Sequence, residues 1–339
     1  MSKEIYKNKT ILITGGTGSF GKNFIKKILK DKLPFKRIII FSRDELKQHE
    51  MKLSEDFNEK KYNQLRFFIG DVRDRERLFW ALKEVDYVIH AAALKQILTG
   101  EYNPFEAIKT NVIGSQNIVD AALNSNVKKV IALSTDKAVS PVNLYGATKL
   151  CSDKLIISSN NIKGKKKISF SVVRYGNVTG SRGSVIPEFL KQKTYGNFLV
   201  TEKSMTRFNI SLESAVEMVL WALKNAIGGE IIIPKIKAFR VVDLAKAIDP
   251  KLKIKFMGIR PGEKIHEELI STADNLNTYD IGKYYALLNG EKKLLSYYEK
   301  KFNAKKVPIN FSYTSESKNS LLKNLELKKL IKEYLSKKE

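Results

Sequence analysis

Residues 10–21 read TILITGGTGSFG, an apolar run followed by closely spaced glycines. The apolar and β-branched residues 10–14 predict a buried strand, and a cluster of glycines follows at once. A helix is then predicted from about Gly18 to Lys30. A strand that ends in a glycine turn and enters a helix is typical of the first unit of a parallel α/β sheet.

The same alternation of strand and helix continues along the first half of the chain. Helix starts are marked by capping residues such as Ser42 or Asp44. Regular alternation favours right-handed crossovers and a Rossmann-type, doubly wound parallel sheet. The predicted strands are 37–42, 65–70, 86–93, 127–136 and 168–178, and the predicted helices between them include 42–52, 75–83 and 103–126.

After Gly180 the alternation becomes less regular, which predicts a smaller α+β lobe over the strand ends. The predicted helices there are one from Val185, 212–226, 240–248 and 262–270, and the predicted strands are 198–202, 229–235 and 253–259. The residues from about 290 onward are rich in lysine and end in an amphipathic helical pattern.

Composition narrows the class of protein. The 339 residues carry a net charge of +25, and only 11 of the 61 basic residues are arginine. These lysines are spread along the chain without the arginine-rich stripe of a nucleic-acid site, so we expect no nucleic-acid partner. No apolar run is long enough for a membrane span and no signal peptide is visible, so we expect no membrane partner and a cytoplasmic location. The single cysteine, Cys151, excludes an intrachain disulfide and is expected to be a small buried filler.

Glycines 15, 18 and 21 form a G-x-x-G-x-x-G pattern between the first strand and its helix. Glycines let backbone amides approach a pyrophosphate, and the helix N-terminus favours its negative charge. The pattern predicts a dinucleotide site. Its predicted residues are Gly15, Thr17, Gly18, Ser19, Phe20 and Gly21.

The end of the second strand selects the dinucleotide. Enzymes that use NAD place a carboxylate there, on the ribose 2′-hydroxyl. Here Ser42 and Arg43 come first and Lys47 follows one helical turn later, which favours the 2′-phosphate of NADP, with NAD as the alternative. Asp71 and Val72 fit an adenine-contacting turn, and the small residues Ala91, Ala92 and Ala93 fit a position that admits the cofactor.

These patterns divide the chain into three parts. Residues 1–180 are expected to form an NADP-binding Rossmann domain, to which strands and helices return around 205–240. Residues 181–290 are expected to form most of a substrate-binding lobe. Residues 291–339 are expected to form a lysine-rich helical extension.

Residues 131–149, IALSTDKAVSPVNLYGATK, are expected to supply the catalytic side chains. Tyr145 and Lys149 are four residues apart and share one helix face. With the glycine pattern, they resemble the extended short-chain dehydrogenase/reductase family. In that family the tyrosine is the base, and the lysine lowers its pKa and holds the nicotinamide ribose.

The chain is similar, more narrowly, to the configuration-inverting UDP-N-acetylglucosamine 4,6-dehydratases, which open the route to pseudaminic acid and related surface sugars. The likeness rests on Thr135-Asp136-Lys137 before the tyrosine and covers nearly the whole chain. One departure is ILTG after Gln96, where a proline-containing turn is expected. The other motifs are TGGTGSFGK, SRDELKQ, GDVRDRERL, AAALKQ, EYNPFEAIKTN, RYGNVTGSRGSV, MTRF, GGEIIIPKI and GIRPGEKIHE.

The resemblance implies a role for each residue of this stretch. Tyr145 takes the proton of the 4-hydroxyl, Lys137 removes the C5 proton, and Asp136 protonates the departing 6-hydroxyl. Thr135 bonds the C4 oxygen. The implied product is UDP-2-acetamido-2,6-dideoxy-β-L-arabino-hex-4-ulose. Retaining relatives carry Glu at the Lys137 position.

The resemblance also places residues on the sugar nucleotide. The expected substrate contacts are Lys95, Asn177, Arg182, Arg207, Arg260 and Glu263. His49, His90 and His266 are too scattered for a metal site, so no metal is expected. We expect a homo-oligomer, a dimer or a hexamer.

Three alternatives remain open at this point. A retaining 4,6-dehydratase and a nucleotide-sugar 4-epimerase share the fold and the Tyr145–Lys149 pair. A non-catalytic module that senses NADP is a different class, and it has no need of Asp136 and Lys137.

Overall fold

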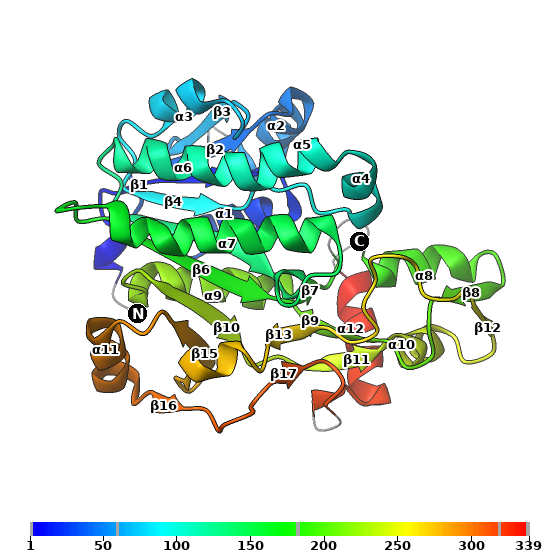
Figure 1. The fold of residues 1–339 in the computed structure, drawn as a ribbon. Helices are drawn as coiled ribbons and strands as arrows, with labels where there is room; N and C mark the ends of the chain where they lie inside the picture. The colour runs from blue at the N-terminus through cyan, green and yellow to red at the C-terminus, as the bar shows by residue number, and fades with distance from the viewer. Residues whose placement is uncertain (1–2, 59–60, 181–183, 318–319, 337–339) are drawn as a thin grey trace.

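A parallel β-sheet extended by three antiparallel strands runs through the molecule, with helices on both faces (Figure 1). The structure, a computed structural model, describes residues 3–58, 61–180, 184–317 and 320–336. Ten strands of the described residues join this sheet in the order β16-β14-β15-β10-β6-β5-β4-β1-β2-β3. The stretch β3-β2-β1-β4-β5-β6 is the Rossmann order, so the predicted fold class is confirmed.

The strands of the main sheet fall into two groups. Seven are parallel: β1 Thr10–Thr14, β2 Arg37–Ser42, β3 Leu65–Ile69, β4 Tyr87–His90, β5 Lys129–Thr135, β6 Ser169–Tyr175 and β10 Glu230–Pro234. Three are antiparallel and extend the β10 edge: β15 Tyr284–Leu288, β14 Thr278–Asp280 and β16 Lys305–Lys306.

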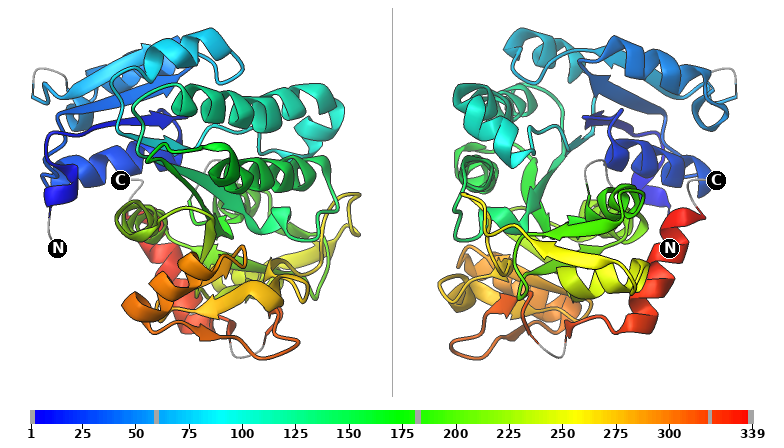
Figure 2. Two further views of the ribbon diagram at one scale, coloured as in Figure 1. Left: turned by 60° about the vertical axis from the view of Figure 1, so that its left-hand side comes forward. Right: turned by 90° about the vertical axis from the view of Figure 1, so that its right-hand side faces the viewer.

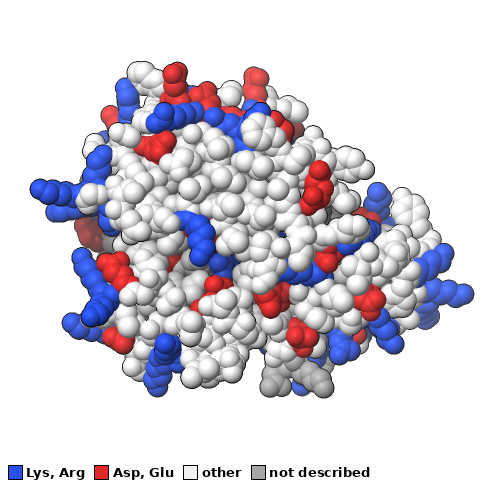
Figure 3. Space-filling view, in the orientation of Figure 1, with Lys and Arg blue, Asp and Glu red and all other residues white. Residues whose placement is uncertain are grey.

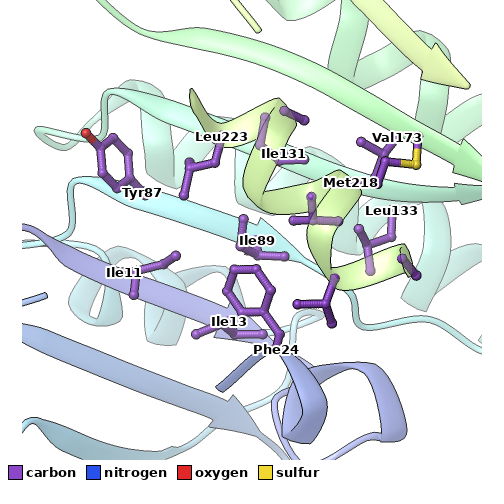
Figure 4. Close-up of a cluster of buried hydrophobic side chains, with 14 of the residues drawn as sticks. Ile11, Ile13, Phe24, Tyr87, Ile89, Ile131, Leu133, Val173, Met218 and Leu223 are labelled. Carbon is purple, nitrogen blue, oxygen red and sulfur yellow. The ribbon is translucent and has the colours of Figure 1, made fainter. Parts of the chain in front are cut away.

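Side chains of the parallel strands alternate between two apolar cores. Ile11 and Ile13 of β1 point to one face, where they pack with Phe24, and Leu12 points to the other (Figure 4). A strand buried on both faces needs an unbroken apolar run, which is why β1 reads TILIT. The helices of the first face are α1 Ser19–Lys30, α2 Glu45–Leu53, α9 Leu212–Asn225 and α11 Lys292–Phe302; those of the second are α3 Arg75–Ala81, α6 Gly114–Leu123 and α7 Leu144–Ile162.

A third core lies in the lobe, where α12 packs on α10, and Figure 2 shows α12 in red on that side of the molecule. Three small sheets complete this region. Their strands are β7 Asn177–Val178, β9 Thr206–Ile210 and β11 Ala238–Arg240; β8 Asn197–Val200 and β12 Lys253–Phe256; β13 Glu268–Ile270 and β17 Tyr313–Thr314. The lobe helices are α8 Val185–Lys193, α10 Val241–Ile248 and α12 Asn324–Leu335.

The predicted helix over 103–126 is interrupted. α4 Ile97–Tyr102 and α5 Pro104–Ile108 come first, and a π-helical turn, Lys109–Ile113, joins α5 to α6. The turn places the buried amide of Asn111 against both backbone groups of Leu94, at 2.9 Å each. Short 3₁₀ turns lie at Glu4–Tyr6, Glu55–Phe57, Asp136–Ala138 and Asp274–Asn277.

Other expectations differ from the structure. Residues 262–270 were expected to form a helix, but they form a turn followed by β13, because this segment pairs with β17. Cys151 is exposed, since the buried face of α7 carries Lys149, Ser152 and Asp153.

Strands from all three expected parts of the chain join the main sheet. β14 and β15 come from the range 181–290. β16 joins the same sheet from the expected C-terminal extension.

In Figure 3 the broad face over α6 and α7 is mostly uncharged, and lysines and arginines lie mainly around its edges. Among the described residues, no helix combines the length and apolarity that a bilayer crossing requires.

Candidate active site

An open cleft of about 960 Å³ lies at the carboxyl ends of the parallel strands. It extends across the point between β1 and β4 where the strand order reverses, which is the usual ligand position in such sheets. The lining contains these predicted residues: Gly15, Thr17, Gly18, Ser19, Phe20, Gly21, Ser42, Arg43, Lys47, Asp71, Val72, Ala91, Ala92, Ala93, Lys95, Thr135, Asp136, Lys137, Tyr145, Lys149 and Asn177.

The glycine turn fits the pyrophosphate of a dinucleotide. Gly15 has a φ of +64°, and a Cβ on Gly21 would lie 2.5 Å from the carbonyl oxygen of Gly16. α1 can therefore begin close to the turn only with these glycines. α1 also begins without a side-chain cap and without an acidic residue in its first turn, so its positive end is available to an anion.

The far end of this site carries the two predicted cations. Arg43 is half-exposed and lies 3.6 Å from Asp71, and Lys47 pairs with Asp44, the N-cap of α2. The hydroxyls of Thr17 and Ser42 meet at 2.8 Å and join the glycine turn to β2. Asp71 and Asp44 are thus each paired with a cation at this end of the cleft.

Thr14, at the end of β1, has a role that the motif reading did not assign. Its hydroxyl accepts hydrogen bonds from the amides of Ala91 and Ala92, at 3.1 and 3.2 Å, and contacts His90 Nδ1 at 2.9 Å. His90 is buried, and burial lowers its pKa to about 3. The ring is therefore neutral at neutral pH where it contacts Thr14, and the Thr14 hydroxyl bonds the alanine loop to β1.

The 3₁₀ turn after β5 presents the acid and the amine. Thr135 caps the turn: its hydroxyl accepts from the amide of Lys137 at 3.3 Å and donates to Asp136 Oδ1 at 2.9 Å. Asp136 is fully buried, and its Oδ2 is among the described buried atoms without a hydrogen-bond partner. Burial raises the pKa of this carboxyl, and the neighbouring Lys137 opposes that rise.

The Lys137 ammonium lies between two carboxylates. Its Nζ is 3.0 Å from Asp136 Oδ1, 3.2 Å from Glu267 Oε1 and 3.5 Å from Asn177 Oδ1. Burial alone would lower the pKa of Lys137, but the two carboxylates outweigh burial and raise it. The predicted acid and amine are therefore held together in the cleft rather than spread over a solvated surface.

Tyr145 and Lys149 lie on α7, which packs closely on the 3₁₀ turn Asp136–Ala138. A Cβ on Gly146 would lie 2.2 Å from the carbonyl oxygen of Lys137, so only glycine permits this approach. Burial raises the pKa of Tyr145 to about 12, and the charge of Lys137 and a hydrogen bond with Thr135 oppose that rise. The resemblance implied that Lys149 lowers the pKa of Tyr145, but the side chains around Tyr145 leave that pKa raised. Lys149 is buried, and burial lowers its pKa.

The expected substrate residues separate into two sets. Lys95 and Asn177 line the cleft, whereas Arg207, Arg260 and Glu263 do not belong to its described lining. Arg207 instead donates to the carbonyls of Thr206 and Ile265, at 2.7 and 3.1 Å, and lies 3.6 Å from Glu267. Its guanidinium is thus engaged inside the lobe. Arg182 lies outside the described residues.

Glu267, which lies 3.2 Å from Lys137 Nζ, is a candidate site residue that sequence reasoning missed. It closes the quoted motif GIRPGEKIHE, but no spacing rule links it to Lys137, 130 positions earlier. For metals, no group of three or more His, Cys, Asp or Glu side chains within the described part of the chain is arranged to hold an ion.

Comparison with known proteins agrees with this geometry. The pattern of the family described as "Polysaccharide biosynthesis protein" matches residues 11–289. The chain is 51% identical over 334 residues to the UDP-N-acetylglucosamine 4,6-dehydratase (inverting) of Campylobacter jejuni subsp. jejuni serotype O:23/36, which covers 96% of this chain and 98% of the relative.

A second sequence and one solved structure are also similar to this chain over nearly its full length. A UDP-glucose 4-epimerase of Rickettsia akari is 44% identical over 337 residues, covering 96% of each chain. The X-ray structure of Pen from Bacillus thuringiensis superposes with a TM-score of 0.87 at 36% identity, covering 97% of this chain and 99% of that one. The chain therefore belongs to the polysaccharide biosynthesis proteins of extended short-chain dehydrogenase/reductase type, and its predicted resemblance to the inverting UDP-N-acetylglucosamine 4,6-dehydratases is confirmed.

Proposed function

We propose that the protein is a hydro-lyase that converts UDP-N-acetylglucosamine to its 4-keto-6-deoxy derivative with inversion at C5. The observation that carries this proposal is the buried Asp136–Lys137 pair, 3.0 Å apart, in the same cleft as Tyr145. An oxidoreductase acting at one carbon needs only the tyrosine and its lysine. Elimination across two carbons also needs an acid and a base of its own.

A nicotinamide dinucleotide fits the other half of the cleft. The glycine turn and the start of α1 would hold the pyrophosphate, Lys149 the nicotinamide ribose, and Arg43 with Lys47 the 2′-phosphate that makes NADP the proposed cofactor rather than NAD. When bound, the nicotinamide supplies a hydride acceptor for C4 and a hydride donor for C6.

Tyr145 acts at C4. Its phenolate takes the proton of the 4-hydroxyl as that carbon is oxidised to a ketone, and the ketone acidifies the hydrogen on C5. Thr135, beside Tyr145 and Asp136, is placed to hold the C4 oxygen. Burial raises the pKa of Tyr145 to about 12 even though the charge of Lys137 opposes that rise, so the positive charge of an oxidised nicotinamide would be needed to make phenolate accessible.

Asp136 and Lys137 act at C6 and C5. A proton that moves along their 3.0 Å contact leaves a neutral amine and a carboxylic acid, the two forms that elimination requires. The amine then takes the C5 proton, the acid gives its proton to the 6-hydroxyl, and water leaves. Reprotonation of C5 from the opposite face inverts that centre.

The test is NMR of the products from a panel of UDP-sugars incubated with the protein and NADP⁺ in deuterium oxide. We expect UDP-N-acetylglucosamine to give a 4-keto-6-deoxy product of L-arabino configuration with deuterium at C5. A gluco-configured ketone indicates a retaining dehydratase. A protein that binds NADP and turns over no sugar in the panel is a sensing module.

A 4-epimerase is the second candidate, because relatives 44% identical to this chain carry that name. An epimerase leaves C5 and C6 untouched. It therefore yields a product that retains its 6-hydroxyl and takes up no deuterium at C5, and a Lys137→Ala variant keeps full activity. Unlabelled UDP-glucose and UDP-galactose interconverted in the same panel identify this function.

We further propose a homo-oligomer, a dimer or a hexamer, located in the cytoplasm. Apolar side chains at Leu98, Tyr102 and Phe105 are well exposed on α4 and α5, and burying them against another copy is favourable. Light scattering on the purified full chain tests the oligomer. The division into a Rossmann domain, a substrate lobe and a C-terminal extension also remains a proposal, testable by limited proteolysis.

A further inference from the structure

Lys137 has a second carboxylate partner that comes from the lobe. Glu267 Oε1 lies 3.2 Å from Lys137 Nζ, nearly as close as Asp136 Oδ1 at 3.0 Å. Both carboxylates are buried, and the side chain of Glu267 is 3% exposed. An ionised carboxylate is costly to bury without a partner, so this placement ties Glu267 to the Lys137 amine.

The lobe holds Glu267 from both sides of its backbone. Its amide donates to Ser315 Oγ and its carbonyl accepts from the amide of Ser315, both at 2.8 Å. The Ser315 hydroxyl also contacts Thr206 Oγ1 at 2.7 Å. Ser315, directly after β17, therefore fixes the backbone of Glu267 at the cleft, and Thr206 of β9 holds the Ser315 hydroxyl.

A second cation shares the same oxygen of Glu267. Arg207 Nε lies 3.6 Å from Oε1, and the Arg207 Nη1 is anchored on the Ile265 carbonyl at 3.1 Å. Burial alone would raise the pKa of Glu267, but Lys137 and Arg207 outweigh it and lower that pKa. Glu267 thus stays a carboxylate near neutral pH.

We propose that Glu267 is a positioning residue for catalysis: together with Asp136 it holds the Lys137 amine at C5, and Arg207 holds Glu267. This inference rests on the proposed dehydratase function. Asp136 changes its protonation state during elimination, because it gives its proton to the leaving hydroxyl. Glu267 acts through Lys137, exchanges no proton with the sugar and keeps its charge, so it stabilises the ammonium that forms when Lys137 takes the C5 proton.

The protonation of Lys137 depends on every charged group around it. Asp136 and Glu267 favour the ammonium form, and Arg207 disfavours it. Tyr145 on α7 and Lys264 also interact electrostatically with Lys137. Glu267 keeps its negative charge throughout the proposed reaction, and that charge raises the pKa of Lys137. Removing it should therefore lower the pKa of the Lys137 amine.

The experiment measures exchange of the C5 hydrogen of the gluco-configured 4-keto-6-deoxy sugar with deuterium oxide, by NMR across a pH series. This sugar, the product of a retaining dehydratase, serves as substrate because its C5 hydrogen lies on the face that Lys137 is proposed to attack, and the enzyme-free rate is subtracted. This partial reaction requires neither oxidation at C4 nor departure of water. In the wild type, exchange should rise with pH as Lys137 loses its proton.

In Glu267→Gln the rise should move to lower pH by about one to three units, because removing an anion beside a cation lowers the pKa of the cation. The matched control, Glu268→Gln, removes the next carboxylate, which contacts Ser140 rather than Lys137, and should leave the curve unchanged. An unshifted curve in a folded Glu267→Gln protein would overturn the proposal.

A second variant, Glu267→Asp, tests whether the position of the carboxylate matters as well as its charge. It also tests the proposal if the Glu267→Gln protein does not fold. It keeps the charge but shortens the reach, so the rise should stay at the wild-type pH while the exchange rate falls at least about tenfold. Exchange at the wild-type rate would refute the positioning role. Wild-type protein that forms no C5-labelled product would instead refute the proposed function.

Discussion

The dinucleotide end of the cleft and its sugar end are built from parts at different distances along the chain. At the dinucleotide end, the glycine turn and the start of α1 are adjacent in sequence, and β1 and β2 follow one another closely. At the sugar end, Lys137 of the turn after β5 meets Glu267 before β13, and Ser315 after β17 fixes Glu267.

The difference indicates that one end of the cleft binds the cofactor and that the other end determines which reaction takes place. A local strand-turn-helix unit suffices to cradle a pyrophosphate, and it recurs with little change in proteins of different activity. The acid–amine pair needs a buried site with a second carboxylate, which only the folded lobe provides. Changes at the sugar end should therefore alter the reaction, and changes at the dinucleotide end should alter cofactor binding.

The largest effect is expected from the acid–amine pair. Asp136→Asn and Lys137→Met should each lower kcat for dehydration by about 10²- to 10⁴-fold, because each removes a proton-transfer group. The Michaelis constant for UDP-N-acetylglucosamine should change little. Product formation followed by NMR measures the loss, and Lys154→Met on the exposed side of α7 is the control. Full activity in Lys137→Met would favour an epimerase.

Tyr145→Phe should lower the rate of C4 oxidation by about 10²- to 10⁴-fold through loss of the base. Because the Tyr145 pKa is raised to about 12, the active phenolate is scarce at neutral pH and becomes more abundant as pH rises. The wild-type rate of C4 oxidation should therefore increase with pH. A kinetic isotope effect with C4-deuterated substrate identifies that step, and a flat pH profile would contradict this assignment of the base.

A glycine substitution tests how tightly α7 must pack on the 3₁₀ turn Asp136–Ala138. In Gly146→Ala the new Cβ would meet the Lys137 carbonyl at 2.2 Å, so the turn must shift. We expect a loss of about 1–3 kcal/mol in the free energy of unfolding, together with lower activity. Gly100→Ala, whose Cβ would meet only Ala107 at 4.0 Å, should keep both stability and activity. Chemical denaturation compares the two variants, and equal stabilities would argue against the close packing.

The smallest effect is expected at Arg43, on the rim of the dinucleotide end. Arg43→Ala should weaken NADP binding about tenfold and leave NAD binding nearly unchanged, because one partly exposed charge faces the 2′-phosphate. Calorimetric titration with both dinucleotides measures the preference. Arg37→Ala, which removes the Glu84 pair at the start of β2, is the control. Equal losses for NADP and NAD would show that Arg43 does not select the cofactor.

The sequence predicted the parts of the site that one continuous segment determines. Gly15, Gly21, Tyr145 and Lys149 follow from spacing, because turn and helix geometry fix where nearby residues point. The strands of the parallel sheet were likewise visible as apolar runs.

Glu267 was beyond this reasoning, because strand pairing between β13 and β17 places it and no local periodicity records that pairing. The same pairing explains why residues 262–270 were wrongly expected to be helical: the Glu267 amide bonds Ser315 instead of a preceding turn. Thr14 also escaped notice, since its two acceptor contacts lie on a loop 77 and 78 residues away.

One measurement tests directly whether C4 chemistry and C5 chemistry belong to different side chains. The gluco-configured 4-keto-6-deoxy sugar, whose C5 hydrogen lies on the face that Lys137 is proposed to attack, is incubated in deuterium oxide with the wild type, with Tyr145→Phe and with Lys137→Met, and C5 labelling is followed by NMR. We predict labelling by the wild type and by Tyr145→Phe, and labelling at the enzyme-free rate with Lys137→Met. Labelling by Lys137→Met at the wild-type rate would contradict the account.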